Sequence, residues 1–227
     1  LAEPVVNDRS LALNLTNEIG AGGRIRLLKN IAGLWLLQEC RRAWALDGQD
    51  FSYEELTRLA REARPHAALI DPDAFIEPSG MPAQIDAWCR KTGQPPPGSP
   101  AQYARVILES LALRYREVLE MIEDLLGRRL AVIHIVGGGS RNDLLNQFVA
   151  DSTGRAVVAG PAEATAIGNV LVQAIGSGAI AGLDEARALV RRSFEVREFA
   201  PAPSADWDAA RARYRAICRT AGTSAQP

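Results

Sequence analysis

The sequence predicts an α/β fold, and three observations lead to it. The second half alternates in the order helix, strand, helix, strand, helix, which is typical of parallel strands joined by right-handed crossovers. A short apolar run at 130–136 ends in three glycines and is followed by a helical pattern. The chain has 227 residues, 47% of them hydrophobic, which is enough for one large domain or two small ones.

Composition argues against several classes of partner. There are 26 basic and 27 acidic residues, giving a net charge of −1, so neither a nucleic-acid surface nor a polybasic membrane surface is expected. No signal peptide or membrane-spanning apolar run is visible. The three cysteines are far apart and odd in number, which predicts reduced thiols in the cytoplasm. Self-association into a homo-oligomer is left open.

The first elements along the chain are a strand and two helices. Residues 11–19 are predicted to form a strand and 20–23 a flexible turn. A helix is expected from 24 to about 45, because apolar residues cover almost every face of its first half. A second helix is predicted at 52–64, where Ser52 and Glu55 have capping-box spacing.

The middle of the chain contains the longest predicted helix. Residues 65–81 read as a loop, and a short helix follows at 82–91. A proline-rich connector at 95–100 leads into a helix over 100–126. Ser99 is a good N-cap for this helix, and Gly127 is a good terminator.

The strand at 130–136 and its glycine turn carry the strongest functional signal. The strand is apolar apart from His134, a pattern that favours burial in a sheet covered on both faces, with His134 as a core residue. Ser140 is expected to cap a helix over 141–151. Without side chains, Gly137, Gly138 and Gly139 would let an anion or nucleotide approach the backbone.

The alternative interpretation of this turn is a tight connection that binds nothing. The motif is not the dinucleotide fingerprint, because Asn142 stands where the third glycine belongs. It is not a Walker A loop either, since no Gly-Lys-Ser/Thr follows.

The rest of the chain is predicted to complete the sheet. A strand is expected at 155–159, followed by a turn at 160–161 and helices at 162–175, 184–193 and 205–220. Ligands of parallel sheets bind beyond the carboxyl ends of the strands, where both glycine turns lie. This placement favours a ligand site over a simple turn.

Two long segments carry a family resemblance. Residues 16–42 (TNEIGAGGRIRLLKNIAGLWLLQECRR) and 133–173 (IHIVGGGSRNDLLNQFVADSTGRAVVAGPAEATAIGNVLVQ) resemble the carboxy-terminal domain of the FGGY carbohydrate kinases. The resemblance implies an actin-like ATPase, ribonuclease-H-like domain with a mixed sheet flanked by helices. It makes residues 1–227 the nucleotide-side domain, without its first strand or strands and without the amino-terminal domain.

The resemblance also implies site residues and ligands. It places Gly138 against ATP within the triplet 137–139, and Asn142 near the adenosine. It assigns Asn30 and Gln38 to ATP binding, and eight residues on one helix would let both face the same side. The alternative is a buried polar pair bonded to backbone. Magnesium would be held mainly by the phosphates and by the amino-terminal domain.

What the chain lacks limits the implied activity. In the family the catalytic aspartate and most sugar contacts belong to the amino-terminal domain. We therefore expect this chain alone, which starts at Leu1 like a piece of a longer protein or a mature chain missing its start, not to phosphorylate a sugar. The implied reaction is phosphorylation of a ketose, with L-rhamnulose giving L-rhamnulose 1-phosphate favoured over fuculose or xylulose.

Two other functions compete with that of a kinase half. One is a non-catalytic nucleotide-binding or regulatory module of the same fold. The other is an NAD-dependent oxidoreductase domain, which is disfavoured because no acidic residue ends the strand at 155–159.

Overall fold

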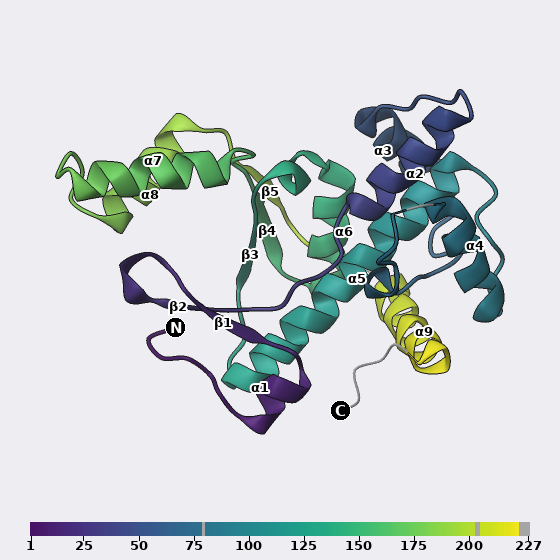
Figure 1. Ribbon diagram of the computed structural model, residues 1–227, viewed down its shortest axis with the longest axis horizontal. Coiled ribbons are helices and arrows are strands. Elements are labelled where there is room, and N and C mark those ends of the chain that lie inside the picture. The colour runs from purple at the N-terminus through teal and green to yellow at the C-terminus, as the bar shows by residue number, and fades with distance from the viewer. Residues whose placement is uncertain (79, 203–204, 223–227) are drawn as a thin grey trace.

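The computed structural model describes residues 1–78, 80–202 and 205–222. The long helix α5 (Pro100–Leu126) forms the axis of the molecule. It packs against α6 (Asp143–Thr153) beside the main sheet, and against α2 (Trp35–Leu46) and α3 (Tyr53–Glu62) at its other end (Figure 1). Its first residues form a helix for the predicted reasons, since the Ser99 side chain accepts a bond from the Gln102 N–H. Gly127 ends it in the left-handed conformation, with φ 62°.

The main sheet is mixed, as the family resemblance implies. Strands β3 (Val132–Ile135) and β4 (Ala156–Ala159) are parallel, with Ile133 opposite Val157. Strand β5 (Arg197–Phe199), which the sequence analysis missed, runs antiparallel to β4. Three residues are too few to show a clear alternation of apolar and polar side chains.

The prediction that β3 is buried on both faces is wrong. Ile133 and Ile135 pack against the core, but Val132 and His134 on the other face are exposed. His134 is therefore not a core residue. An apolar run of this length does not reveal whether one face or two are covered, because only the packing of other elements decides it.

The amino-terminal part forms a separate hairpin of β1 (Thr16–Ile19) and β2 (Ile25–Leu28), after the short helix α1 (Asp8–Ala12). The predicted strand at 11–19 is thus correct only in its second half. The predicted helix at 24–45 is wrong in its first half, which contains β2 and an irregular segment. A turn at η1 (Ala21–Gly23) with positive φ at its glycines folds the chain back, so strand pairing overrides the helical pattern.

The other predicted helices are confirmed, with small shifts at their ends. Ser52 caps α3 by accepting the Glu55 N–H at 3.0 Å. Helix α4 spans Met81–Lys91, after the short turn η2 (Pro72–Ala74). Helices α7 (Ala164–Gly176) and α8 (Leu183–Ser193) project away from the sheet, whereas α9 (Ala205–Ala221) packs beside α5 and α6.

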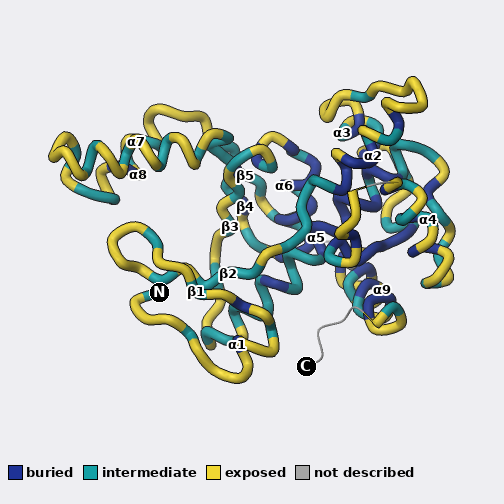
Figure 2. Tube along the Cα trace, viewed as in Figure 1, coloured by how far each residue is buried: buried dark blue, intermediate teal, exposed yellow. Residues whose placement is uncertain are grey.

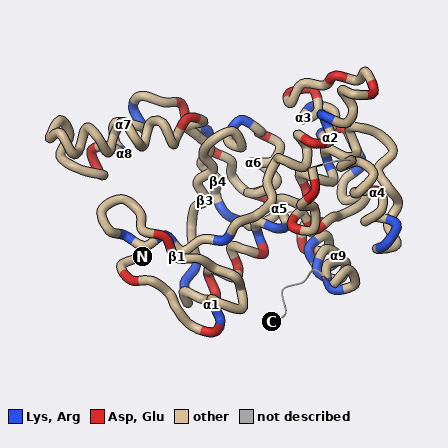
Figure 3. The backbone as a smooth tube through the Cα atoms, viewed as in Figure 1, with Lys and Arg blue, Asp and Glu red and all other residues tan. Residues whose placement is uncertain are grey.

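The hydrophobic core lies on the side of α2, α4 and α5 (Figure 2). It contains the largest fully buried side chains, among them Leu36, Leu37, Leu56, Leu69, Ile70, Ile85, Ile107, Leu108, Leu111 and Leu113. Helix α7 has no buried residue, and the hairpin is mostly exposed. Lys and Arg residues are interspersed with Asp and Glu residues along the chain (Figure 3).

Candidate functional site

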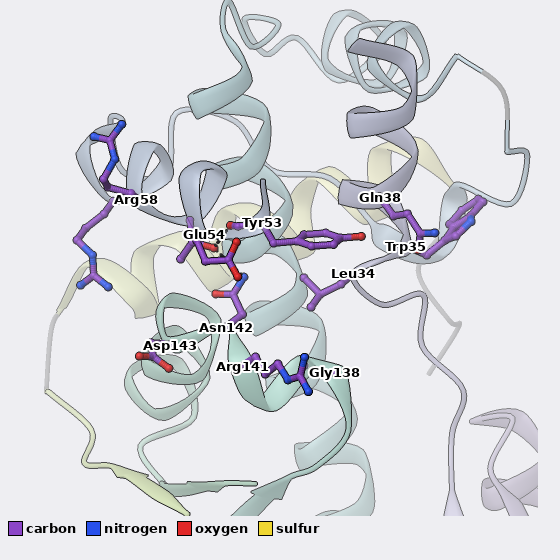
Figure 4. A pocket seen from close by; sticks show the side chains of 13 residues that line it. Leu34, Trp35, Gln38, Tyr53, Glu54, Arg58, Gly138, Arg141, Asn142 and Asp143 are labelled. Atoms are coloured by element: carbon purple, nitrogen blue, oxygen red, sulfur yellow. Dashed lines mark hydrogen bonds between the residues drawn. The ribbon is translucent and has the colours of Figure 1, made fainter. Parts of the chain in front are cut away.

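A cavity of about 680 Å³ lies where three segments of the chain meet. One wall comes from the start of α2, the second from α3, and the third from the glycine turn and the start of α6 (Figure 4). The volume is within the range of small-molecule sites. The lining residues are Leu34, Trp35, Gln38, Tyr53, Glu54, Thr57, Arg58, Arg61, Gly138, Gly139, Arg141, Asn142 and Asp143.

The glycine turn offers backbone to this cavity. Gly137 has φ 76°, a left-handed conformation that favours glycine, and its N–H donates to the Pro161 carbonyl at 3.3 Å. At Gly138 the backbone is not left-handed, and an added Cβ would meet no atom within 4 Å. The backbone of Gly138 therefore faces open space, and a ligand can come close to it.

The turn is held rigidly from behind. The Ser140 carbonyl accepts bonds from the Asn146 side chain at 3.0 Å and from Arg197 at 2.8 Å. Arg197, on β5, also forms an ion pair with Asp143. The Ser140 hydroxyl donates back to the Gly137 carbonyl at 2.7 Å. The predicted cap by Ser140 is wrong, because η3 (Gly138–Arg141) occupies these residues and α6 starts later.

Asn142 is the true N-cap of α6, and it also joins α6 to α3. Its Oδ1 accepts the Leu145 N–H at 3.0 Å, and its Nδ2 donates to the Thr57 hydroxyl oxygen at 3.3 Å. Thr57 in turn donates to the Tyr53 carbonyl at 2.7 Å. This chain of bonds fixes the distance between two walls of the cavity.

The wall at the start of α2 is positioned by a partly buried ion pair. Asp73 accepts the Ala32 N–H at 3.0 Å and pairs with the Arg114 guanidinium at 2.7 Å. This anchors the irregular segment 29–34 that precedes α2. Burial and the neighbouring Arg114 lower the pKa of Lys29 in this segment, against an opposing effect of Asp73.

The structure brings most of the predicted residues to one place. Gln38, Gly138, Gly139 and Asn142 line the cavity, and Gly137 lies next to it in the turn. Asn30 is exposed in the segment before α2 and is not among the lining residues. The prediction that Asn30 and Gln38 share a helix is wrong, because α2 begins only at Trp35.

Sequence reasoning missed the α3 wall and the brace behind the turn. Tyr53 directly follows the predicted cap Ser52, but a cap motif carries no information on what the next side chain faces. Arg197 is distant in sequence from the turn that it holds. Within residues 1–78, 80–202 and 205–222, no three His, Cys, Asp or Glu side chains form a group that could hold a metal ion. Nor does any helix there have the length and apolar character needed to cross a bilayer.

Comparison with known proteins identifies the family. The model for the carboxy-terminal domain of the FGGY family of carbohydrate kinases matches residues 1–177. The chain belongs to this family. The FGGY chain is 48% identical to a rhamnulokinase of Bacteroides thetaiotaomicron over 218 residues, covering 95% of this chain and 44% of the relative. A rhamnulokinase of Enterobacter sp. (strain 638) is 43% identical over 203 residues, covering 87% of this chain and 40% of the relative.

Solved structures agree on the fold of this FGGY chain. A xylulose kinase from Rhodospirillum rubrum superimposes with a TM-score of 0.59 at 21% identity, covering 82% of this chain and 38% of that one. A glycerol kinase from Plasmodium falciparum, solved with ADP, gives 0.56 at 16% identity, covering 92% of this chain and 41% of that one. The chain spans less than half the length of the curated relatives it matches.

Proposed function

We propose that the cavity binds ATP and that the chain is the nucleotide-side half of a sugar kinase. The observation that carries the proposal is the open backbone of Gly138, which lies in a cavity bounded by apolar, aromatic and polar side chains. A nucleotide needs such a mixture, because its base is apolar and flat while its ribose and phosphates are polar.

The residues present fit ATP, and each has a distinct task. Leu34 and Trp35 offer apolar surface for a base, and the exposed Gln38 amide can donate to or accept from polar groups on the ligand. Gly138 admits the ligand to the backbone. Arg58 and Arg141 stand at the rim, where each is paired with a glutamate at 3.6 and 3.4 Å.

Magnesium belongs to the proposal as the ion bound to the ATP phosphates. When bound, it would neutralise phosphate charge in the transfer. Asp143 lines the cavity but is paired with Arg197, and among the residues that the structure describes no group of carboxylates forms a preassembled metal cage.

The proposed reaction is phosphorylation of a ketose, with L-rhamnulose converted to L-rhamnulose 1-phosphate. Its support is the similarity to rhamnulokinases over most of this chain. The amino-terminal domain of the family would supply the general base and most sugar contacts. The cytoplasm is the proposed compartment, in keeping with three buried cysteines that form no disulfide bond.

The test is a pair of measurements on the full-length product of the gene. Calorimetric titration should show ATP binding, and a coupled assay should show turnover with L-rhamnulose above fuculose and xylulose. ATP binding without turnover on any sugar would favour a non-catalytic nucleotide-binding module. Absence of ATP binding would refute the proposal.

A further inference from the structure

Tyr53 differs from the other residues that line the cavity. Tyr53 is 41% exposed, although it is a large residue, and it is the first residue of α3. Figure 4 shows the ring extending from α3 into the cavity, with its hydroxyl toward the side of Gln38 and Trp35. In the ranges that the structure describes, no other aromatic ring pairs with Tyr53, whereas Trp44, Trp88 and Trp207 each pack against a ring.

One face of this ring is already occupied. The Arg41 guanidinium carbon lies 4.1 Å from the centroid of the ring. Arg41 is itself fixed, because its Nε donates to the Phe51 carbonyl at 2.6 Å. The Arg41 cation covers one face of the ring, and it leaves the edge and the opposite face uncovered by its guanidinium.

The backbone that carries Tyr53 is fixed relative to the glycine turn. Thr57 donates to the Tyr53 carbonyl and accepts from Asn142, which caps α6. The ring is therefore backed by Arg41, and the backbone that carries it is linked through Thr57 to Asn142 beside the glycine turn. Little conformational entropy is lost when a flat ligand stacks on a ring held in this way.

We propose that Tyr53 is the stacking platform for the base of the nucleotide, backed by Arg41. The inference rests on the proposed ATP site and adds its base-recognition element. Stacking is tolerant of base identity, because every base has a π-face, so Tyr53 contributes affinity while polar groups such as Gln38 contribute discrimination. Arg41 does not line the cavity and acts as a positioning residue.

The experiment compares variants of the full-length gene product by calorimetric titration with ATP, adenosine and inorganic tripolyphosphate. Tyr53→Ala should lower the affinities for ATP and for adenosine by the same factor, about 5- to 150-fold, which is the range for loss of one base–aromatic stack. Tyr53→Phe keeps the ring and should stay within about threefold of the unsubstituted protein. Tripolyphosphate has no base, so the unsubstituted protein and both Tyr53 variants should bind it with the same affinity.

Phe194→Ala is the matched control, since Phe194 is 42% exposed and lies outside the cavity. Arg41→Lys should restore most of the affinity that Arg41→Ala loses, which a purely structural role of Arg41 does not require. The stacking role is overturned if Tyr53→Ala binds ATP as tightly as the unsubstituted protein. It is also overturned if this substitution lowers the affinity for tripolyphosphate as much as the affinity for ATP.

These measurements distinguish the stacking role of Tyr53 from the proposed ATP site on which it rests. If the unsubstituted protein binds ATP and Gly138→Val weakens binding, the ATP site stands whatever Tyr53→Ala does. If the unsubstituted protein does not bind ATP, both proposals fail together. If tripolyphosphate binds too weakly to measure, the ATP and adenosine titrations of Tyr53→Ala decide.

Discussion

Replacing Gly138 by valine tests the candidate site directly, because the structure separates binding from stability at this position. An added Cβ would meet no atom within 4 Å, and the backbone of Gly138 is not in the left-handed region. The free protein should therefore accept the side chain at a cost within about 0.5 kcal/mol, as for other open surface positions. For a chain of this size, that corresponds to a melting-temperature shift below about 2 °C.

The same substitution should have a much larger effect on the affinity for ATP. A branched side chain would occupy the space where the ligand meets the backbone, and overpacking of this kind costs about 1–3 kcal/mol. At 1.4 kcal/mol for each tenfold change, ATP affinity should fall by about 5- to 150-fold. The assay is calorimetric titration of the full-length gene product with ATP, accompanied by thermal melting of each variant.

The matched control is Gly168→Val in α7. Gly168 also has open space around its Cβ position and no left-handed backbone, but it does not line the cavity. It should leave ATP affinity unchanged. A folded Gly138→Val protein that binds ATP as tightly as the control would show that the nucleotide does not lie against this turn.

Three further predictions concern activity, thiol chemistry and acid stability. The 227-residue chain alone should show no ketose phosphorylation; turnover near the ordinary kinase range of about 1–100 per second would contradict the assignment of the general base to another domain. All three cysteines should be in the reduced thiol form, with Cys40 and Cys89 slow to react in the folded protein. Burial, aided by Glu39, raises the pKa of Cys40 from 9.0 to about 12, and burial, aided by Asp86, raises that of Cys89 to about 11. Titration with a thiol reagent should give three equivalents after unfolding, and fast native reaction of either residue would be inconsistent with their burial. Burial raises the pKa of Glu123, but the Leu130 N–H and the Arg155 guanidinium outweigh it and hold this pKa below its ordinary 4.5. This depressed pKa contributes stability above pH 4.5 that is lost as pH falls through the folded value. Glu123→Gln should therefore lower the unfolding free energy at pH 7 by ~1.5–3 kcal/mol and flatten its pH dependence below 4.5, as measured by urea unfolding. If the unfolding free energy of Glu123→Gln falls below pH 4.5 as steeply as that of the unsubstituted protein, the stabilising pairing of Glu123 with Arg155 is refuted.

The local elements were predictable where the responsible interaction is itself local. The helix after Ser99 and the helix after Ser52 begin where a side-chain cap satisfies free N–H groups. The glycine turn after β3 was also predictable from local sequence, because Gly137 adopts a left-handed backbone conformation that favours glycine. The cap of α6 was not, because Ser140 and Asn142 are both good caps and the short turn η3 selects the second.

The site was predictable in part. Gln38, Gly138, Gly139 and Asn142 line the cavity, and their assignment to ATP remains a prediction. The predicted position of Asn30 on a helix was wrong because the residues just before it pair in the hairpin as β2, and Asn30 lies in the irregular segment that joins β2 to α2. Pairing of β2 with β1 is a contact between segments, and a helical pattern in one segment does not report it.

By itself, the sequence determined the α/β class, most of the helices, the glycine turn and the family. These follow from periodicity, caps and long matching segments, all of which are properties of residues close together along the chain. The tertiary structure alone decided that β3 is covered on one face, that Arg197 braces the turn, and that Tyr53 enters the cavity. Each of these depends on which distant segments meet, and that is settled by packing of the whole core rather than by any local preference.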